Sequence, residues 1–355
     1  MDWVDEILRA AVVQSYNLSF TKADKKSNQL FSLGYYDQQG LVKFSDFKRV
    51  SGRFNSEYKL FDDHLRIGEN ISLSHSWGTS VSNNAALGGT LYEAYKFQSI
   101  TPVKNLEDEY AGNVFSDIPN PMGKLYRNKD NQDKKSRLVG NLYAELHLFD
   151  GLMFKTSFGV DYNNLYRRSF SPKYDELNAS EKLSSLSNRN AWNFNWVFTN
   201  TLTYNKTFGD HTINALLGME SLRNRYEYFT ASRDGFPSDD PNFRFLDAGD
   251  VGTQKNSGAA TEYSMVSYFG KLDYNYHDRY LVAFTLRRDG SSRLGNNKWG
   301  NFPAASVGWR ISNEPFFDVE AISNLKYALV GDRMETRMFR RMRRLTHIRV
   351  ILRTR

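Results

Sequence analysis

Charged and carboxamide side chains recur at every second position in three separate segments of this 355-residue chain. Alternate residues of a strand point to the same face, so each segment, if extended, presents one polar surface. Such side chains hydrogen-bond polar solutes and water, and they also hold neighbouring parts of a protein. We expect them to form one polar, solute-facing wall. They are Arg53, Asn55, Glu57, Asn193, Asn195, Lys271 and Asp273, and Arg49 and Asn275 extend two of the segments.

No catalytic signature accompanies this polar set. The chain contains no phosphate-binding loop, dinucleotide-binding glycine pattern, zinc-binding helix motif or nucleophile elbow. It has no cysteine, which excludes both a disulfide framework and a thiolate metal site. Three histidines, His64, His211 and His277, stand in short polar turns without metal-type spacing, which favours a repeated role in the turn. The sequence therefore predicts no catalytic residue, no cofactor and no enzyme.

Two further features leave a sharper alternative open. Glu69 and His75 interrupt an otherwise apolar stripe, and they mark a strand end, a register change or a catalytic carboxylate–imidazole pair. Acidic clusters at residues 107–109 and 239–240 could hold calcium through oxygen ligands, although solvated loop charge is the commoner explanation. We expect neither a catalytic pair nor a metal site.

The elements that would position the polar wall are strands, because apolar and polar residues alternate with a period of two. Several alternating segments exceed the roughly 5–6 residues usual in soluble sheets and match the roughly 9–11 that cross a bilayer obliquely. A period of two over so many segments predicts an all-β protein. The segments are residues 49–60, 65–77, 138–148, 154–162, 192–204, 213–219, 268–276, 280–286 and 305–311.

The connections between these strands are of two kinds that alternate along the chain. Short polar turns are expected at residues 61–64, 149–151, 208–211 and 277–279. Long loops rich in Asn, Ser, Asp and Pro are expected at residues 78–136, 163–190 and 221–262. Tight turns on one rim and long loops on the other are typical of a transmembrane barrel, in which the long loops are extracellular.

Composition supports the same architecture. Aromatic residues make up 15% of the chain, yet the mean hydropathy is −0.60. This combination suits a barrel wall, in which apolar residues alternate with polar ones and rings near strand ends form interfacial girdles. Packing between two sheets is the simpler alternative for these rings. The acidic first residues do not resemble a signal peptide, so we expect any export signal to lie outside this sequence.

Several segments resemble the SusC/RagA family of TonB-linked outer-membrane receptors. The resemblance begins near residue 2 and includes residues 14–19, 32–40, 47–49 and 65–70. It is most specific at residues 268–312, which include the runs LRRDGSSR and WGNFPAAS, and it ends near residue 328. The likeness therefore covers almost the whole chain.

The resemblance implies a large plugged barrel of about 22 strands, of which we place about eleven here. It also implies import of oligosaccharides or peptides across the outer membrane of a Gram-negative, Bacteroidetes-like cell. A SusD-like surface lipoprotein and the TonB complex are the implied partners, and the latter contacts an N-terminal region outside these residues. Much of the polar wall would then contact the plug and water. We expect about half a barrel, inactive by itself because lipid cannot satisfy open sheet edges.

The net charge of +7 is confined to the end of the chain. Residues 331–355 contain nine Arg, one Asp and one Glu, so the remainder is neutral. These residues depart from the family pattern after Val330, and loss of one base can produce such a change. A genuine basic arm for nucleic acid or membrane is the alternative. We expect residues 1–13 to end a plug or linker, 14–330 to form the partial barrel, and 331–355 to be out of frame, with no nucleic-acid partner.

A second function belongs to another class: a secreted all-β carbohydrate-binding protein whose exposed aromatic rings stack on sugars. The two hypotheses predict different positions for the apolar side chains of the strands. A barrel needs outward apolar residues on every strand, whereas a lectin needs them only on its core-facing side.

Overall fold

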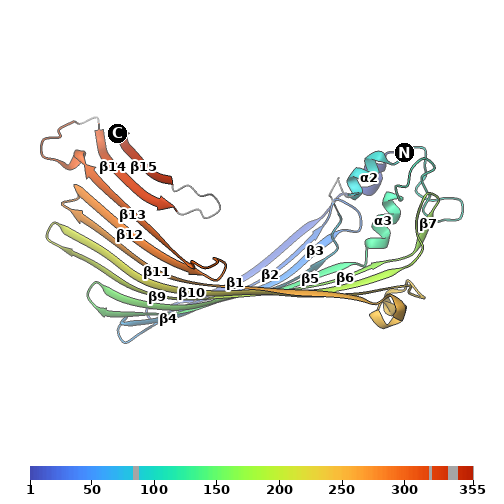
Figure 1. Cartoon of the computed structure of the whole chain (residues 1–355), viewed down its shortest axis with the longest axis horizontal. Helices are drawn as coiled ribbons and strands as arrows, with labels where there is room; N and C mark the ends of the chain where they lie inside the picture. The colour runs from blue at the N-terminus through green and yellow to red at the C-terminus, as the bar shows by residue number, and fades with distance from the viewer. Residues whose placement is uncertain (83–87, 320–321, 335–342, 355) are drawn as a thin grey trace.

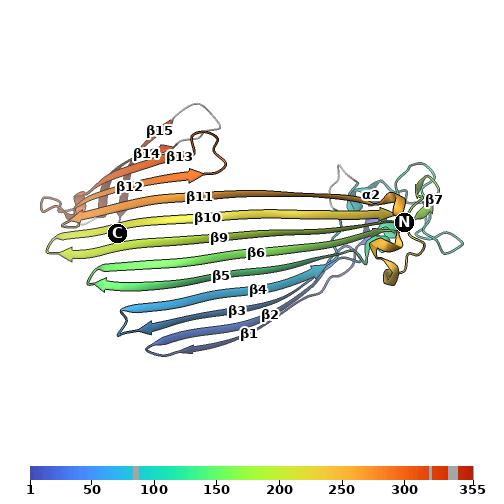
Figure 2. The ribbon, with the colours of Figure 1, turned by 60° about the horizontal axis from the view of Figure 1, so that its bottom comes forward.

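The structure is a computed structural model, and it describes residues 1–82, 88–319, 322–334 and 343–354. One large antiparallel sheet dominates it (Figure 1). The sheet has 13 strands in the order β1–β6, β9–β15, so each strand of this sheet pairs with the sheet strands before and after it in the chain. Figure 2 shows these strands side by side, and Figure 1 shows that the sheet curves into an open trough. The all-β prediction is confirmed.

The strands that form the wall are unusually long, and the longest contain 24 residues. They are β1 (Val13–Ala23), β2 (Ser27–Gln39), β3 (Asp46–Leu60), β4 (Leu65–Gly78), β5 (Gln132–Phe149), β6 (Leu152–Ser171), β9 (Ser185–Phe208), β10 (His211–Asp234), β11 (Lys255–Tyr276), β12 (Tyr280–Ser291), β13 (Trp299–Arg310), β14 (Ile322–Met334) and β15 (Arg343–Thr354). A separate two-stranded sheet contains β7 (Tyr174–Glu176) and β8 (Ala179–Glu181).

The two faces of the wall differ as the alternation predicts. Residues directly opposite each other in an antiparallel pair share a face, so the register places Phe158 beside Phe198 and Leu272 beside Phe284. This apolar face exposes a large hydrophobic side chain on each of twelve wall strands. They are Leu18, Phe31, Phe54, Leu73, Leu142, Phe158, Phe198, Leu217, Leu272, Phe284, Val307 and Leu329.

The predicted long loops at residues 163–190 and 221–262 are wrong in extent. Strand β6 continues to Ser171 and β9 begins at Ser185, and the connection between β10 and β11 covers only residues 235–254. Apolar alternation fades in these extensions, but backbone pairing does not depend on it. A sheet can continue wherever both strands still find hydrogen-bonding partners. The wall therefore continues beyond the apolar segments that the sequence shows.

The two rims of the wall are built differently. The predicted short turns are confirmed, and most need left-handed backbone: Phe61, Asp62 and Asp63 have φ of 52–70°, and Gly151 has φ of +88°. The opposite rim carries the connection between β4 and β5, the β7–β8 hairpin and the 3-10 helices η2 (Pro241–Phe243), η3 (Leu246–Ala248) and η4 (Val251–Thr253). We call these ends the turn rim and the loop rim.

Three short helices gather at the loop rim and were not predicted. They are α1 (Trp3–Ile7), α2 (Thr90–Lys96) and α3 (Pro121–Asn128). Trp3, Ile7, Phe97 and Leu125 are the largest members of the core that they share. Figure 1 shows α2 and α3 above the concave side of the sheet. No helix in the described part of the chain is long and apolar enough to cross a membrane.

The two ends of the chain belong to the loop-rim core and to the large sheet, respectively. Helix α1 packs in the loop-rim core, while the assignment of residues 1–13 to a plug or linker stays a prediction. Strand β14 continues past Val330 to Met334, and β15 pairs with it antiparallel. Residues 335–342 and 355 lie outside the described residues. The prediction that residues 331–355 are out of frame is a statement about the gene, and it stays a prediction.

Candidate functional site

The polar residues singled out in the sequence share one face of the wall. Arg53 lies opposite Ser72, and the register continues through Val139 and Asp161 to Asn195. Pairing then continues through β10 to β11, where Lys271 and Asp273 occupy positions that share this face. This face is the concave side of the trough, and helices cover it at the loop rim (Figure 1).

The polar face does not gather these residues into a single site. Strands β3 and β9 are separated by three others, which puts Arg53 and Asn195 roughly 20 Å apart at the usual strand spacing. Contacts are local: the Asn224 amide donates to Asn193 at 2.7 Å and also to Asn195, and Lys271 pairs with Asp273 at 2.8 Å. Their role in substrate binding stays a prediction.

A better-defined site, missed in the sequence, lies at the loop rim. Its centre is Asn120, which is fully buried and caps α3 by accepting from the backbone N–H groups of Met122 and Gly123. Its amide donates to the carbonyls of Val103 and Ala111, both at 3.0 Å. An asparagine before a proline is a common start of a helix, so the signal was present in the sequence. Asn120 therefore fixes the fold of the β4–β5 connection around α3.

An ion pair ties the β7–β8 hairpin to α3. The Glu176 carboxylate is 3% exposed, accepts from Arg127 at 2.6 Å and accepts from the Asn120 backbone N–H at 2.6 Å. Arg127 also lies 3.8 Å above the Tyr174 ring, a cation–π geometry. On the other side of α3, Lys124 pairs with Glu93 of α2 at 2.6 Å. Charged contacts thus hold α3 between two other parts of the loop rim.

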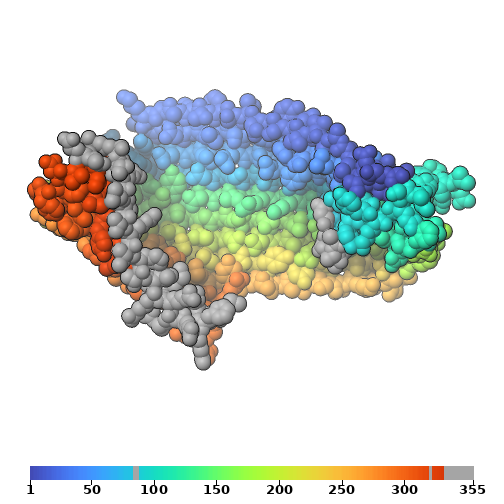
Figure 3. Space-filling model, turned by 90° about the horizontal axis from the view of Figure 1, so that it is seen from above, coloured from blue at the N-terminus to red at the C-terminus, as the bar shows by residue number. Residues whose placement is uncertain are grey.

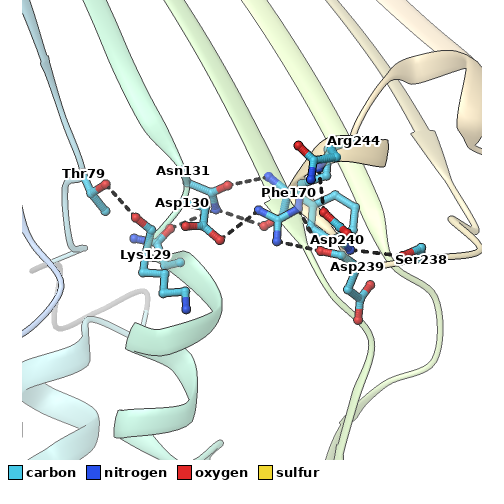
Figure 4. A network of polar contacts seen from close by, with 11 residues as sticks. Thr79, Lys129, Asp130, Asn131, Phe170, Ser238, Asp239, Asp240 and Arg244 are labelled. Carbon is cyan, nitrogen blue, oxygen red and sulfur yellow. Dashed lines mark hydrogen bonds and ion pairs between the residues drawn. The ribbon is translucent and has the colours of Figure 1, made fainter.

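Arg244 joins three separate segments at the loop rim, and Figure 4 shows its contacts. Its guanidinium donates twice to the Asp239 carbonyl and pairs with Asp130 at 3.3 Å. It also lies 4.5 Å above the ring of Phe170 at the end of β6. Asn131 exchanges hydrogen bonds with the backbone of Phe170, at 2.7 and 3.0 Å. The β10–β11 connection is thereby fastened to the β4–β5 connection and to the wall.

Two adjoining hollows open beside this network. The first, of about 570 Å³, lies between α3 and the upper ends of β5 and β6. The second, of about 610 Å³, lies between α3, the β7–β8 hairpin and η2. Both are lined by Arg127, Pro172 and Tyr174, so they form two halves of one groove, which we call the rim groove. Figure 3 shows the residues of the β4–β5 connection, in cyan, gathered at this end of the trough.

Two tyrosines of the groove remain hydrogen-bond donors at neutral pH. Burial raises the pKa of Tyr110 and of Tyr174 above the ordinary value of a phenol. Tyr126, which is 44% exposed, lies beside Tyr110 with ring centroids 5.9 Å apart. The groove therefore offers both aromatic faces and neutral hydroxyl groups.

The sharper alternatives for chemistry gain no support from the geometry. Glu69 accepts a hydrogen bond from Ser56, whereas His75 contacts Ser136 at 2.9 Å, so the two do not form a pair. Of the acidic clusters, Asp108 pairs with Lys104. Among the residues that the structure describes, no three His, Asp or Glu side chains gather closely enough to hold a metal ion.

Sequence comparison relates the chain to known receptors. No protein-family model matches it. The TonB-dependent receptor P3 of Formosa agariphila is 30% identical over 92% of this chain, and the TonB-dependent receptor SusC of Bacteroides thetaiotaomicron is 29% identical over 92%. The chain spans about a third of the length of these relatives, 33% and 34% respectively.

Comparison with solved structures agrees with the sequence comparison. The RagAB peptide transporter superposes with a TM-score of 0.81 at 22% identity, covering 94% of this chain and 38% of that one. The ferripyoverdine receptor of the outer membrane of Pseudomonas aeruginosa gives a TM-score of 0.54 at 10% identity, over 96% of this chain and 46% of that one. Both similarities concern the fold alone. In sequence the chain is similar to part of TonB-dependent receptors such as SusC, and in fold it is similar to part of the RagAB peptide transporter.

Proposed function

We propose that this chain forms part of the barrel of an outer-membrane receptor that imports oligosaccharides or peptides with energy from the TonB complex. The observation that carries the proposal is the two-faced wall. Each of twelve strands exposes an apolar side chain on one face, and the other face carries Asn, Asp, Lys and Arg. Lipid outside and water inside require such a wall, whereas a secreted carbohydrate-binding sheet needs apolar residues only toward its core.

The polar face then lines the lumen. Arg53, Asn55 and Glu57 on β3, with Asn193 and Asn195 on β9, would contact a solute or the plug domain. Lys271 and Asp273 would do the same from β11. A SusD-like surface lipoprotein would cover the loop rim, and TonB would act through an N-terminal region of the complete receptor.

These residues by themselves should not transport. Every residue of β1 is exposed, and its free edge has unpaired backbone groups that lipid cannot satisfy. We therefore propose that the wall functions only when further strands close it. Resequencing the locus tests the accompanying proposal that residues 331–355 are out of frame. Barrel-coding sequence resuming one base out of register would support it, and a stop codon with no barrel sequence beyond would refute it.

Arginine substitution tests the membrane assignment. In the complete receptor, Phe158→Arg and Phe284→Arg should each cost about 2–4 kcal/mol of folding free energy near the bilayer midplane. Asn141→Arg, on the polar face, is the matched control and should cost much less. Folding into lipid vesicles, followed by urea titration, measures the difference. If arginine on the apolar face costs no more than at Asn141, the membrane proposal is wrong.

A further inference from the structure

Two unpaired cations stand next to each other on the apolar face of the wall, near the loop rim. Lys134 of β5 lies opposite Tyr166 of β6, and Arg168 follows Tyr166 by two residues, so both cations share the face of Phe158. Such diagonal neighbours have Cα atoms roughly 7–8 Å apart. Neither cation forms an ion pair with a carboxylate in the described part of the chain. We call Lys134 and Arg168 the outer basic pair.

The strands around the outer basic pair do not neutralise it. Strands β4, β5, β6 and β9 lie side by side (Figure 2), and on the apolar face β5, β6 and β9 carry no carboxylate along their whole length. Glu69 of β4 shares the face, but it lies eight residues nearer the turn rim than Trp77, the β4 residue opposite Lys134. Glu181 of β8 lines the first hollow together with Arg168, yet no ion pair joins the two. The pair therefore leaves uncompensated positive charge on this face.

The outer basic pair stands at the level of lipid headgroups. Tyr166 is eight residues beyond Phe158 on β6. A rise of roughly 3.3 Å per residue at a strand tilt of roughly 40° places Tyr166 about 20 Å above Phe158. Half of a bilayer, headgroups included, is roughly 20–22 Å thick. With Phe158 near the bilayer midplane, as proposed above, Lys134 and Arg168 reach the headgroup layer on the loop-rim side.

Aromatic rings flank Lys134 on both sides. Trp77 lies opposite it on β4 and Tyr166 lies opposite it on β6. Trp192 of β9 continues the rings along the same face. Trp and Tyr prefer the boundary between hydrocarbon and headgroups, because one end of the ring system is apolar and the other is polar. The rings therefore support the same placement of the cations, in the headgroup layer.

Two other cations at this level of the apolar face are already compensated. Lys48 of β3 lies opposite Trp77 and pairs with Asp37 at 3.5 Å. Arg225, eight residues beyond Leu217 on β10, pairs with Glu227 at 2.8 Å. These charges are balanced within the protein, whereas the outer basic pair needs an anion from outside it.

We propose that the outer basic pair binds a lipid of the loop-rim leaflet whose headgroup carries a terminal phosphate, one not capped by a cationic group such as choline. Lys134 and Arg168 donate charge-assisted hydrogen bonds to the phosphate oxygens, and the rings of Trp77 and Tyr166 contact the rest of the lipid. Two adjacent cations match such a group, because a terminal phosphate carries roughly two negative charges at neutral pH. This inference rests on the proposed membrane function and names a lipid partner of the wall.

Native mass spectrometry of the complete receptor in phosphatidylcholine nanodiscs tests the proposal. The probes are lipid A and phosphatidic acid at low mole fraction, with dephosphorylated lipid A and diacylglycerol as their matched counterparts. We expect each phosphate-bearing lipid to bind at least about tenfold more tightly than its counterpart. An excess of inorganic phosphate should not displace the bound lipid, because rings as well as cations hold it.

Variants assign the preference to the outer basic pair. Lys134→Gln and Arg168→Gln should each weaken lipid A binding roughly fivefold, as expected for one basic residue near an anionic lipid surface. The double variant should lose the preference, and Lys134→Arg should keep it. Lys48→Gln and Arg225→Gln are the matched controls, because these cations lie on the same face and already have carboxylate partners. Both controls should bind lipid A like the unaltered receptor.

Four results would overturn the outer basic pair. They are equal binding of lipid A and its dephosphorylated form, displacement of lipid A by inorganic phosphate, an unchanged affinity in the double variant, and tighter binding by Glu181→Gln. The last would show that Glu181 already neutralises Arg168.

The stability of Phe158→Arg in the same nanodiscs separates this inference from the proposed function. If Phe158→Arg is destabilised but the unaltered receptor shows no preference for lipid A, the outer basic pair is refuted and the membrane assignment stands. If Phe158→Arg is as stable as the unaltered receptor and lipid A is still preferred, the membrane-spanning assignment is refuted and the phosphate-lipid site stands.

Discussion

The two rims of the wall solve the same problem, joining antiparallel strands, in opposite ways. At the turn rim the connections between β1 and β12 are hairpins of a few residues, and Phe61 at one tip is 77% exposed. At the loop rim the connections build two small cores, one around Trp3 and Leu125 and one around Phe170. Every fully buried hydrophobic side chain in the described residues lies at or near the loop rim.

This difference teaches where the specific features of the molecule are concentrated. A hairpin needs only turn geometry, so its side chains are free to vary as long as the backbone can turn. The loop rim depends on buried side chains that fit one another, and these form the walls of a groove. Substitutions should therefore act cooperatively at the loop rim and locally at the turn rim.

The largest expected effect is at the loop rim. Trp3 is 2% exposed, packs edge-on against Phe97 and donates to the Gln98 carbonyl at 2.9 Å. Trp3→Ala should cost about 3–5 kcal/mol of local stability, since it removes a buried ring and a hydrogen bond. Hydrogen exchange in α2 and α3 of the complete receptor measures the loss. Tyr95→Ala is the control, because Tyr95 is 77% exposed. Equal protection in both variants would mean that α1 does not support the cluster.

Two glycines of the turn rim give an intermediate effect. At Gly151, φ is +88° and an added Cβ would lie 2.4 Å from the Asn205 carbonyl oxygen. At Gly209, φ is +57° but no atom lies within 4 Å of an added Cβ. Gly151→Ala should therefore cost about 2–3 kcal/mol and Gly209→Ala about 1 kcal/mol. Urea unfolding of the folded receptor measures both. Equal costs would show that the close carbonyl at Gly151 moves aside freely.

The smallest effect is a pH dependence at the β3–β4 turn. Arg66 hydrogen-bonds Asp63 in a bidentate pair, at 2.6 Å for each contact, and lowers the pKa of that carboxyl. A carboxyl whose folded pKa is lowered contributes stability above its ordinary pKa of about 3.9, and that stability is lost as the pH falls through the folded value.

The measurement is hydrogen exchange at the β3–β4 turn as the pH is lowered from about 5 through the ordinary carboxyl pKa to about 2. Protection, corrected for the intrinsic exchange rate, should decline over this range in the unaltered receptor. Asp63→Asn and Arg66→Met should each flatten that decline, because either variant removes the pair. The effect should be small, since the Asp63 side chain is 42% exposed. A decline that survives both variants would assign the pH dependence to another group.

The sequence predicted the wall well because a sheet with one apolar and one polar face requires side chains that alternate with a period of two. Phe158 and Asp161, three positions apart, fall on opposite faces as expected. Where β10 leaves the apolar segment after Met219, that contrast fades and the strand was assigned to a loop. Backbone pairing continues there without an apolar signature, and sequence patterns detect side chains rather than backbone hydrogen bonds.

The rim groove could not be predicted for a different reason. Arg127 and Glu176 are 49 residues apart, and Arg244 and Asp130 are 114 apart. A local sequence pattern cannot predict a contact between positions so far apart in the chain. Helix α3 alone had a local signal, the Asn120–Pro121 start, and recognising it would have placed a structured element inside the predicted loop. The seven wall residues share one face, as the alternation predicts, but many other residues share that face and their role stays a prediction.

The pairing of each wall strand with its neighbours in the chain has a consequence for the order of assembly. Hairpins that join nearby residues close at little entropic cost, so the wall can grow strand by strand from β1. The loop rim cannot form strand by strand, because its contacts join residues that are far apart in the chain. The Asn120 contact needs Glu176 in place, and the Phe170 contacts need Phe236 and Arg244 in place. The groove should therefore be the last part of this region to mature, long after the strands beneath it have paired.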